Sequence, residues 1–457
     1  MSEPKKLVVI GGGIAGYPAA IAAARLGVQV TLVEKADLGG TCLNRGCIPT
    51  KAMLQAAKVR RTVGEAAEFG IGGGQGKVNL AKLMARKDRV VAGLRDGVAS
   101  LLRAKKIQVI QGEAELPDPR TVKVGQKTVS ADAVIVATGS QPTTPPIPGL
   151  EKVEYWDSNA FLAMKSLPTS AVIIGGGVVG LEFAQILADL GAKVLVLEML
   201  AQVAPGMDPE LAQGLQKALA AQGVEIVTGA KVEKVTGGKQ ATVHYQVGGQ
   251  GRQAKAERLI VAAGRAPSLG GIDAAKLGLA TEGSALQVDR GLATNLPGVY
   301  AAGDVIGGIM LAHLAMAEGE CAAHNALGGA RAMDYTAIPS CVYTSPEAAW
   351  VGLSEEQATQ RGPVQVGRFP FMAVGKARVL GSSEGLVKIV AGRKHGELLG
   401  VHILGPHATD LIAEAVLALK LECTAEELSA AIHPHPTLSE AMMEAGMSLC
   451  GGAVHMP

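Results

Sequence analysis

Aromatic residues, long apolar runs and strong net charge are all scarce in this sequence. Only 3% of its 457 residues are aromatic. No apolar run approaches the ~18 residues that a membrane-spanning helix needs. The formal net charge is +2 and no long basic run occurs, so the electrostatic footprint of a nucleic-acid-binding protein is missing. We therefore expect neither nucleic acid nor a membrane among its partners.

Cysteine is also scarce, because six cysteines in so long a chain are too few for the disulfide framework of a secreted domain. The polar stretch Met1 to Lys6 leads directly into the apolar run Leu7 to Ile10, without the apolar core of a secretory signal. We therefore expect a soluble, cytoplasmic protein. In a reducing compartment, the pair at C-x-x-x-x-C spacing, Cys42 and Cys47, is a candidate for redox chemistry or metal binding.

Hydrophobic residues and glycine are abundant. Hydrophobic residues make up 48% of the chain, charged residues 18%, and 60 residues are glycine. This composition is typical of a well-buried globular protein whose turns and close backbone contacts depend on glycine. The chain is too long for one compact core, and its length suggests about three or four domains.

The chain contains an internal repeat. In the first copy, the apolar run Leu7 to Ile10 leads into a G-x-G-x-x-G loop, an Ala-rich helical stretch and a second apolar strand that ends at Glu34. The second copy begins at Ala171 and ends its second strand at Glu198. The first glycine and the acid lie 23 positions apart in both copies. The glycines of the two loops are Gly11, Gly13 and Gly16, and Gly175, Gly177 and Gly180.

Each copy meets the requirements of a βαβ dinucleotide-binding fingerprint. The first glycine forms the tight turn, the second lets the backbone approach the pyrophosphate, and the third lets the helix pack on the strand. The acid accepts hydrogen bonds from ribose hydroxyls. Two such sites predict electron transfer between two cofactors, for which FAD and a nicotinamide nucleotide are the usual pair. Glu198 favours NAD over NADP because it would repel a 2′-phosphate, and Met199 and Leu200 supply no arginine to bind one.

Other segments extend this α/β pattern. Strands that run into a glycine turn are predicted over 133–139, 258–265 and 299–304. Four prolines at 142, 145, 146 and 148 cannot continue a helix or a central strand, so a domain boundary is predicted near 148. From about Ile338, strand and turn signals precede a helical pattern over 410–421, with no fingerprint. We therefore predict two Rossmann-like domains followed by a separate α+β domain.

Cys42 and Cys47 lie in the segment Gly39 to Lys51. A disulfide needs Cα atoms within about 7 Å, and residues five apart on a regular helix lie slightly too far apart. The segment must therefore be distorted, which Gly46 makes easier, while Lys51 and a nearby helix N-terminus would favour a thiolate. Two buried thiols, or half of a zinc site, are the alternatives. Since zinc needs further ligands and no second cysteine pair exists, we favour a redox pair and expect no metal.

His433 and His435 lie in the second concentrated segment, which ends at Glu440. A thiol–disulfide reaction needs a base, because the thiolate is the nucleophile. A histidine held by a carboxylate suits this task, since the acid fixes the ring and stabilises its protonated form. Two histidines beside prolines are by themselves more often loop structure, but the redox pair reverses that preference. His313, in contrast, is expected to cap or pack the start of a helix.

Together these residues resemble the lipoamide dehydrogenases of the pyridine nucleotide–disulfide oxidoreductase family. The resemblance runs nearly end to end and includes both fingerprints and the segments 39–51, 137–139, 303–304, 311–313, 338–346 and 435–440. It implies an FAD-binding domain (1–148), an NAD-binding domain (149–268), a central domain that completes the FAD site (269–335) and an interface domain of a homodimer (336–457). Cys341 departs from the usual aliphatic residue, and Cys450 is single where mercuric reductases have a vicinal pair.

The resemblance implies that dihydrolipoamide is oxidised to lipoamide, with electrons passing through the Cys42–Cys47 disulfide and FAD to NAD. Cys42 would meet the substrate and Cys47 would contact the flavin. His435, oriented by Glu440, would be the base. In such enzymes the histidine and the cysteine pair come from different subunits.

The resemblance also implies cofactor contacts. Lys51 would lie by flavin N5, paired with Glu182, and Asp304 would bind the ribityl chain. A helix N-terminus over Met310, Leu311, Ala312 and His313 would face the pyrimidine end of the flavin. The other residues expected at FAD, besides the first glycine set, are Glu34, Gly40, Thr41, Ala114, Thr138, Gly139 and Ser140. Those expected at NAD, besides the second glycine set, are Glu198, Val232 and Gly264.

The expected protein partners are the lipoyl domain and the peripheral subunit-binding domain of a 2-oxo-acid dehydrogenase complex, or the lipoyl protein of glycine cleavage. Two other functions stay open. An NADPH-dependent reductase of a disulfide or of mercuric ion is disfavoured by Glu198. A protein that binds FAD without disulfide chemistry is disfavoured by the cysteine pair and by the His435–Glu440 motif.

Overall fold

The computed structural model describes residues 5–72, 74, 76–238 and 240–456, and it is a mixed α/β structure, as predicted. Residues 1–4, part of the polar stretch considered above, lie outside the described residues. Among the described residues, no helix is both long and apolar enough to cross a membrane.

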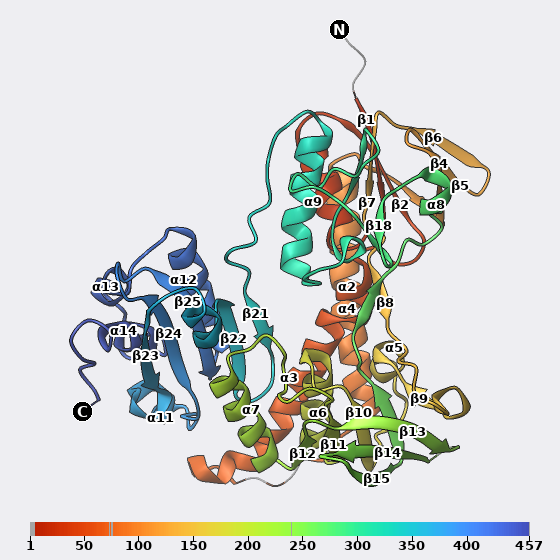
Figure 1. Cartoon of the computed structure of the whole chain (residues 1–457). Helices are drawn as coiled ribbons and strands as arrows, with labels where there is room; N and C mark the ends of the chain where they lie inside the picture. The colour runs from red at the N-terminus through yellow and green to blue at the C-terminus, as the bar shows by residue number, and fades with distance from the viewer. Residues whose placement is uncertain (1–4, 73, 75, 239, 457) are drawn as a thin grey trace.

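A five-stranded parallel sheet forms the first nucleotide-binding unit. Its strand order is β20-β7-β1-β2-β3. The strands are β1 (Lys6–Ile10), β2 (Gln29–Glu34), β3 (Gln108–Gln111), β7 (Ala133–Val136) and β20 (Val299–Ala301). The apolar runs of β1 and β7 are buried on both faces, as in the interior of a parallel sheet. On one face α1 (Gly16–Arg25) lies against α9 (Ala312–Ala326), so β20 and α9 both belong to this unit (Figure 1).

The second five-stranded parallel sheet repeats this arrangement with the order β12-β11-β10-β16-β9. Its strands are β9 (Tyr155–Trp156), β10 (Ser170–Ile174), β11 (Lys193–Leu197), β12 (Val224–Val227) and β16 (Arg258–Val261), and its longer helices are α6 (Val178–Asp189) and α7 (Pro209–Ala221). The sequence repeat therefore predicted two βαβ units correctly. The matching registers Val9↔Leu32 and Ile173↔Val196 show how closely the copies agree.

The chain crosses between the two units along a short antiparallel pair, β8 (Ser140–Pro142) and β17 (Arg265–Pro267). The proline cluster lies at this crossing. Small sheets and further helices complete the two units. They are β4 (Ala114–Asp118), β5 (Thr121–Val124), β6 (Lys127–Ser130), β13 (Lys231–Gly237), β14 (Ala241–Val247), β15 (Gln250–Ala256), β18 (Thr281–Glu282), β19 (Ala285–Leu286), α2 (Gly40–Arg45), α3 (Cys47–Glu65), α4 (Leu80–Ala104), α5 (Ser158–Leu162) and α8 (Ala274–Leu277).

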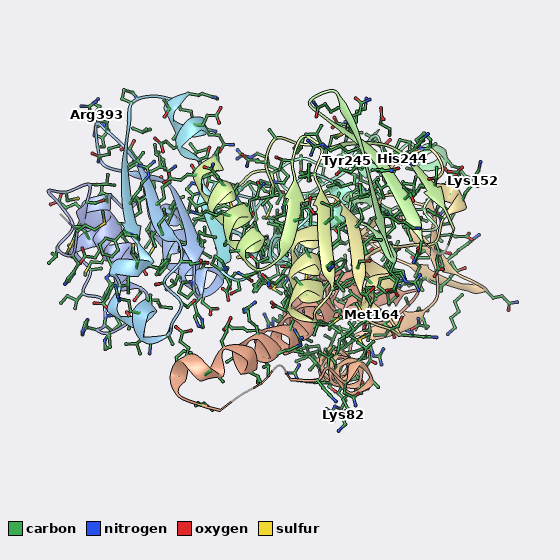
Figure 2. All side chains as sticks on the ribbon, turned by 90° about the horizontal axis from the view of Figure 1, so that it is seen from below. Lys82, Lys152, Met164, His244, Tyr245 and Arg393 are labelled. Carbon is green, nitrogen blue, oxygen red and sulfur yellow. The ribbon has the colours of Figure 1, made fainter. Side chains whose placement is uncertain are left out.

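The C-terminal part is an antiparallel sheet of order β21-β22-β25-β24-β23 with helices packed on it, which confirms the predicted α+β unit. Its elements are β21 (Ser340–Val342), β22 (Glu347–Gly352), β23 (Val364–Pro370), β24 (Leu386–Gly392), β25 (Leu398–Gly405), α10 (Glu355–Thr359), α11 (Gly375–Val379), α12 (Ala408–Lys420), α13 (Ala425–Ala430) and α14 (Glu440–Met447). Seen from below, this unit lies beside the second sheet, on the side away from His244 and Tyr245 (Figure 2). The exact limits of the four domains remain predictions.

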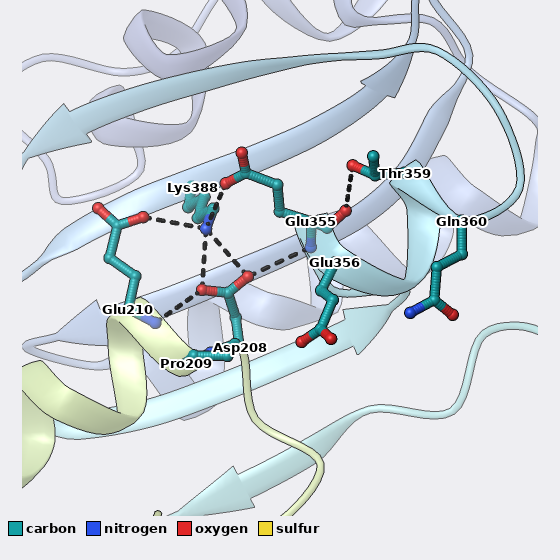
Figure 3. Close-up of a pocket in the computed structure, with 8 residues that line it drawn as sticks. All are labelled: Asp208, Pro209, Glu210, Glu355, Glu356, Thr359, Gln360 and Lys388. Atoms are coloured by element: carbon teal, nitrogen blue, oxygen red, sulfur yellow. Dashed lines mark hydrogen bonds and ion pairs between the residues drawn. The ribbon is translucent and has the colours of Figure 1, made fainter.

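An ionic cluster joins the C-terminal unit to α7 (Figure 3). The Lys388 side chain, only 3% exposed, lies 2.8 Å from Asp208 Oδ1, 2.9 Å from Glu210 Oε2 and 2.8 Å from Glu355 Oε2. Arg368 donates to both glutamates. A buried ammonium needs such partners, because burial without them would be very costly.

Candidate active site

The first fingerprint loop leaves no room for a side chain at its first or third glycine. Gly11 has φ +107°, and a Cβ there would lie 2.2 Å from the Ala137 carbonyl oxygen. A Cβ on Gly16 would lie 1.8 Å from the Gly11 oxygen. Helix α1 then begins with no side-chain cap and no acid in its first turn. Its free N–H groups suit an anion such as a pyrophosphate.

The second loop repeats this geometry. Gly175 has φ +111° and a Cβ there would lie 2.4 Å from the Ala262 oxygen, while one on Gly180 would lie 2.0 Å from the Gly175 oxygen. Around Gly177, in contrast, a Cβ would meet nothing within 4 Å. Helix α6 also begins without a side-chain cap. The loop therefore has open space at the position where a ligand would approach the backbone.

Each loop is held by the acid at the end of its second strand. Glu34 accepts hydrogen bonds from the amides of Gly12 (2.6 Å) and Ala36 (2.7 Å). Glu198 accepts equivalent bonds from Gly176 (2.5 Å) and Leu200 (2.7 Å). Carboxylate oxygens keep further lone pairs, so each acid can also accept a hydroxyl. Both Glu34 and Glu198 can therefore still accept a hydrogen bond from a ribose hydroxyl, as predicted from the sequence.

Gly46 interrupts the helix between the two cysteines. Cys42 lies in α2, which ends at Arg45, and Cys47 is the first residue of α3. Both cysteine side chains are half-buried. The distortion that the spacing predicted is therefore present. Gly40 (φ +58°) brings the start of α2 against the first fingerprint, since its Cβ would lie 2.6 Å from Gly13 Cα.

The two thiols differ in acidity. The Cys42 thiol donates a hydrogen bond to Cys47 and so lowers the pKa of Cys47 to about 7; burial opposes the shift and Lys51 adds to it. The same hydrogen bond, together with burial, holds the pKa of Cys42 well above its ordinary value. A single proton is therefore retained on Cys42 while Cys47 becomes the thiolate, and only the thiolate is reactive.

Lys51 forms the ion pair with Glu182 that the resemblance implied. Its Nζ lies 2.9 Å and 2.8 Å from the two carboxylate oxygens. The Glu182 side chain is 3% exposed and that of Lys51 is 30% exposed. Since Lys51 follows Cys47 by four residues on α3, both side chains lie on one face of that helix. The pair thus joins the cysteine helix to α6 of the second unit.

His435 and Glu440 are also paired, with 2.8 Å between Nδ1 and Oε1. The amide of Thr437 donates to the other carboxylate oxygen. Burial alone would raise the pKa of Glu440, but these hydrogen bonds outweigh it and lower the pKa. With Nδ1 as the donor, Nε2 is free to accept a proton. The His435 side chain is 78% exposed.

The second histidine of that segment has a different environment. The His433 side chain is 6% exposed, donates from Nδ1 to the Ala431 carbonyl and pairs through Nε2 with Glu414 at 2.8 Å. It is therefore a structural residue that supports the loop. Helix α14, next to His435, lies in the C-terminal unit, well apart from α2 in the same chain (Figure 1). Within one chain the structure does not bring His435 to the cysteine pair.

The comparisons with known proteins decide the family. The family model for pyridine nucleotide-disulphide oxidoreductases matches residues 5–319, and the model for the dimerisation domain of that family matches residues 338–446. The chain belongs to the pyridine nucleotide-disulphide oxidoreductase family.

Full-length relatives agree with this assignment. The chain is 43% identical to a dihydrolipoyl dehydrogenase of Thermus scotoductus, over 98% of each chain. It is 41% identical to a dihydrolipoyl dehydrogenase of Bacillus subtilis, over the whole of both. Among solved structures, the HOCl-induced flavoprotein disulfide reductase RclA of Escherichia coli matches with a TM-score of 0.86, 30% identity and 96% and 98% coverage. The chain is therefore an oxidoreductase, and its cofactors are FAD and NAD.

The residues at the end of β7 fit the flavin of this family. The hydroxyl of Thr138 is buried and has no hydrogen-bond partner among the described residues, and a Cβ at Gly139 would meet nothing within 4 Å. Ser140 donates to Asp304. Leu311 precedes the first turn of α9, which has no side-chain cap. An unsatisfied buried hydroxyl, open space and an uncapped helix start are what a polar ligand would require.

The remaining predicted contacts lie around these two sites. Ala114 begins β4 and is buried in the apolar cluster that also holds residues of β1, Val232 packs against the cluster that includes Leu197 of β11, and Gly264 (φ +105°) directly precedes β17. His313 donates from Nε2 to the Pro339 carbonyl at 2.8 Å, in agreement with a packing role at the helix start. Among the described residues, no group of acids, cysteines and histidines is arranged to hold a metal.

Two residues near the flavin site were missed by sequence reasoning. Arg265 donates to the hydroxyl and the carbonyl of Ser140, at 2.8 Å each, and lies 4.0 Å from Asp304. Glu318 is buried in α9 and accepts from the Gly303 amide at 2.9 Å. The only signal was the placement of Arg265 at the end of a predicted strand. Glu318 lies within a helix, where an acid is ordinarily a surface residue.

Proposed function

We propose that this enzyme oxidises the dihydrolipoyl group of a protein to the lipoyl disulfide and reduces NAD to NADH. The observation that carries this proposal is the pair Cys42 and Cys47, two half-buried thiols on either side of the helix break at Gly46, with Lys51 one helical turn beyond Cys47. The names of the full-length relatives support the same substrate. Bound FAD would supply the two-electron step between the dithiol and the nicotinamide.

The protein residues would act through ordinary thiol–disulfide exchange. With the Cys42–Cys47 pair oxidised, one lipoyl thiolate attacks the Cys42 sulfur, and Cys47 leaves as a thiolate. The second lipoyl thiolate then displaces Cys42, which closes the lipoyl disulfide and leaves the reduced pair. The lower pKa of Cys47 makes it the better leaving group. His435 accepts one substrate proton at Nε2, where Glu440 stabilises the imidazolium, and the second proton is retained on Cys42.

The base would come from the partner subunit of a homodimer, which the match to the dimerisation-domain model supports. His435 is exposed in a single chain and lies in the C-terminal unit, and both features favour a function completed by a second copy. We further propose a cytoplasmic location, and as protein partners the lipoyl and peripheral subunit-binding domains of a 2-oxo-acid complex or the glycine cleavage lipoyl protein.

The nicotinamide preference has a structural basis. Glu198 is bonded to the loop of the second fingerprint, and the next two residues, Met199 and Leu200, are 67% and 45% exposed and uncharged. A 2′-phosphate would meet a carboxylate and no cation. This argues against an NADPH-dependent reductase. Cys450, the exposed C-terminal cysteine, has no neighbouring cysteine in the sequence for mercuric ion.

An anaerobic assay of the flavin-loaded enzyme with dihydrolipoamide tests this function. We expect rapid reduction of NAD and at least tenfold slower reduction of NADP. Cys42→Ala should abolish the reaction while FAD stays bound. Near-normal turnover of Cys42→Ala would overturn the scheme. A flavin that binds but accepts no electrons from any dithiol would instead favour FAD binding without disulfide chemistry.

A further inference from the structure

Tyr343 lies where three parts of the molecule meet. It follows β21 of the C-terminal unit, and the Lys51 ammonium of α3 lies 4.5 Å from the centroid of its ring. Its own amide donates to Glu182 of α6 at 3.1 Å. Tyr343 therefore contacts both members of the Lys51–Glu182 pair, one through its ring and one through its backbone.

The position of the ring is determined by hydrogen bonds of the main chain. Two residues along, the Ser345 amide donates to Gln185 at 3.1 Å, and Gln185 donates to Gln222 at 3.0 Å, which in turn donates to the Ser345 carbonyl. Residues three apart on α6 share a face, and alternate residues of an extended segment point the same way. The segment 343–345 is thus held on α6 by two backbone amides, that of Tyr343 at Glu182 and that of Ser345 at Gln185.

An aromatic face attracts a cation by about 0.5–2 kcal/mol, depending on how far the pair is desolvated. Lys51 is half-buried, so the ring adds to the carboxylate in restricting where the ammonium lies. Cys47 is on the same face of α3, one helical turn earlier. The position of the ammonium therefore determines the electrostatic environment of the thiolate and of the adjacent flavin site.

We propose that Tyr343 is a positioning residue whose ring, supplied by the C-terminal unit, holds the Lys51 ammonium beside Cys47 and the flavin. This inference rests on the proposed function for the identity of the flavin site. It goes beyond that function because it makes the electronic environment of the redox pair depend on how the C-terminal unit is attached.

The test compares Tyr343→Leu with the matched variant Tyr343→Phe, which keeps the aromatic face. In the reduced, FAD-loaded protein, the charge-transfer absorbance between a thiolate and the flavin is titrated against pH. We expect its midpoint to rise by about half a pH unit in Tyr343→Leu and to stay unchanged in Tyr343→Phe. The other groups that face Cys47 are Cys42, Glu182 and Arg265, and both variants keep all of them.

A second measurement is flavin reduction by NADH in a single turnover, which should slow about fivefold in Tyr343→Leu and less than twofold in Tyr343→Phe. A lower melting temperature in Tyr343→Leu with an unchanged titration midpoint would show a purely structural role and overturn the inference. Equal shifts in both variants, or no charge-transfer band in the wild type, would overturn it too. The titration needs no dihydrolipoyl substrate, so failure of the proposed function is seen separately, in the wild-type assay.

Discussion

Cys42 and Cys47 are the same residue type five positions apart, yet the pKa of Cys42 is raised and that of Cys47 is lowered. The difference comes from the hydrogen bond between the two thiols, which raises the pKa of Cys42 and lowers the pKa of Cys47. A thiolate at a helix N-terminus is stabilised by the unpaired amides of the first turn. The asymmetry assigns different tasks to the two sulfurs.

The shared hydrogen bond can be removed without removing Cys47. In Cys42→Ser the hydroxyl can still donate, so the alkylation rate of Cys47 should rise with pH around a midpoint near 7. In Cys42→Ala the donor is lost, and burial, the next largest influence, should raise the pKa of Cys47. We therefore expect Cys42→Ala to react several-fold more slowly with iodoacetamide at pH 7. Superimposable pH profiles, measured by mass spectrometry of the Cys47 peptide, would contradict this assignment.

His433 and His435 show how far single residues could be predicted. The sequence indicated a histidine base and its carboxylate, and the His435–Glu440 pair is present. It gave no indication that His433 would be buried against Glu414, nineteen positions earlier. Tyr343 and Glu318 were missed for a similar reason, since their partners lie on other elements.

At the scale of elements, the glycines of one loop have two different tasks. Gly180 permits close contact between α6 and the preceding turn, whereas Gly177 adjoins open space and has an ordinary φ of −74°. A side chain at Gly180 must displace backbone atoms. A side chain at Gly177 can be accommodated as long as no nucleotide is bound.

This contrast predicts different failures for two alanine variants. Gly180→Ala should lower the free energy of unfolding by about 1–3 kcal/mol, because the added methyl overpacks the turn. Gly177→Ala should unfold like the wild type but raise the KM for NAD, because the methyl enters the space near the nucleotide. Urea denaturation and steady-state kinetics distinguish the two. A destabilised Gly177→Ala with normal KM would refute the assignment.

At the scale of the whole molecule, the cluster around Lys388 connects the second nucleotide-binding unit to the C-terminal unit. Burial would raise the pKa of Asp208, but hydrogen bonds from Lys388 outweigh it, and the pKa of Asp208 falls. A carboxyl with a lowered folded-state pKa stabilises the fold above its unfolded pKa of about 4 and loses that contribution as the pH falls further. The ionic cluster around Lys388 should therefore stabilise the protein less in acid.

Lys388→Met would leave the buried Asp208 carboxylate without its ammonium. We expect a loss of about 3–5 kcal/mol at pH 7, the usual result of removing one partner of a buried ion pair. Lys394→Met, at an exposed position of the same unit, should change stability by less than about 0.5 kcal/mol. Urea denaturation at pH 7 and pH 4 provides both comparisons. The wild type should lose part of its advantage over Lys388→Met at the lower pH.

Assembly can be tested with two inactive variants. Cys42→Ser lacks the attacked sulfur, and His435→Gln lacks the base and should lose at least about 100-fold in activity. If each active site combines His435 of one subunit with the cysteines of the other, a mixed dimer of these variants contains one intact site. We expect purified heterodimers to have about half the wild-type activity. Heterodimers as inactive as their parents would show that each chain uses its own histidine.

The sequence by itself determined the local features of this protein. The two fingerprints, their acids, the break at Gly46 and the C-terminal α+β unit follow from periodicity, glycine spacing and turn residues, which act over short distances. Only the tertiary structure decided which residues from distant segments meet. Arg265 at Ser140, Tyr343 at Lys51 and Lys388 at Asp208 are contacts between units. Such contacts depend on how the packed units meet, and no local pattern encodes that geometry.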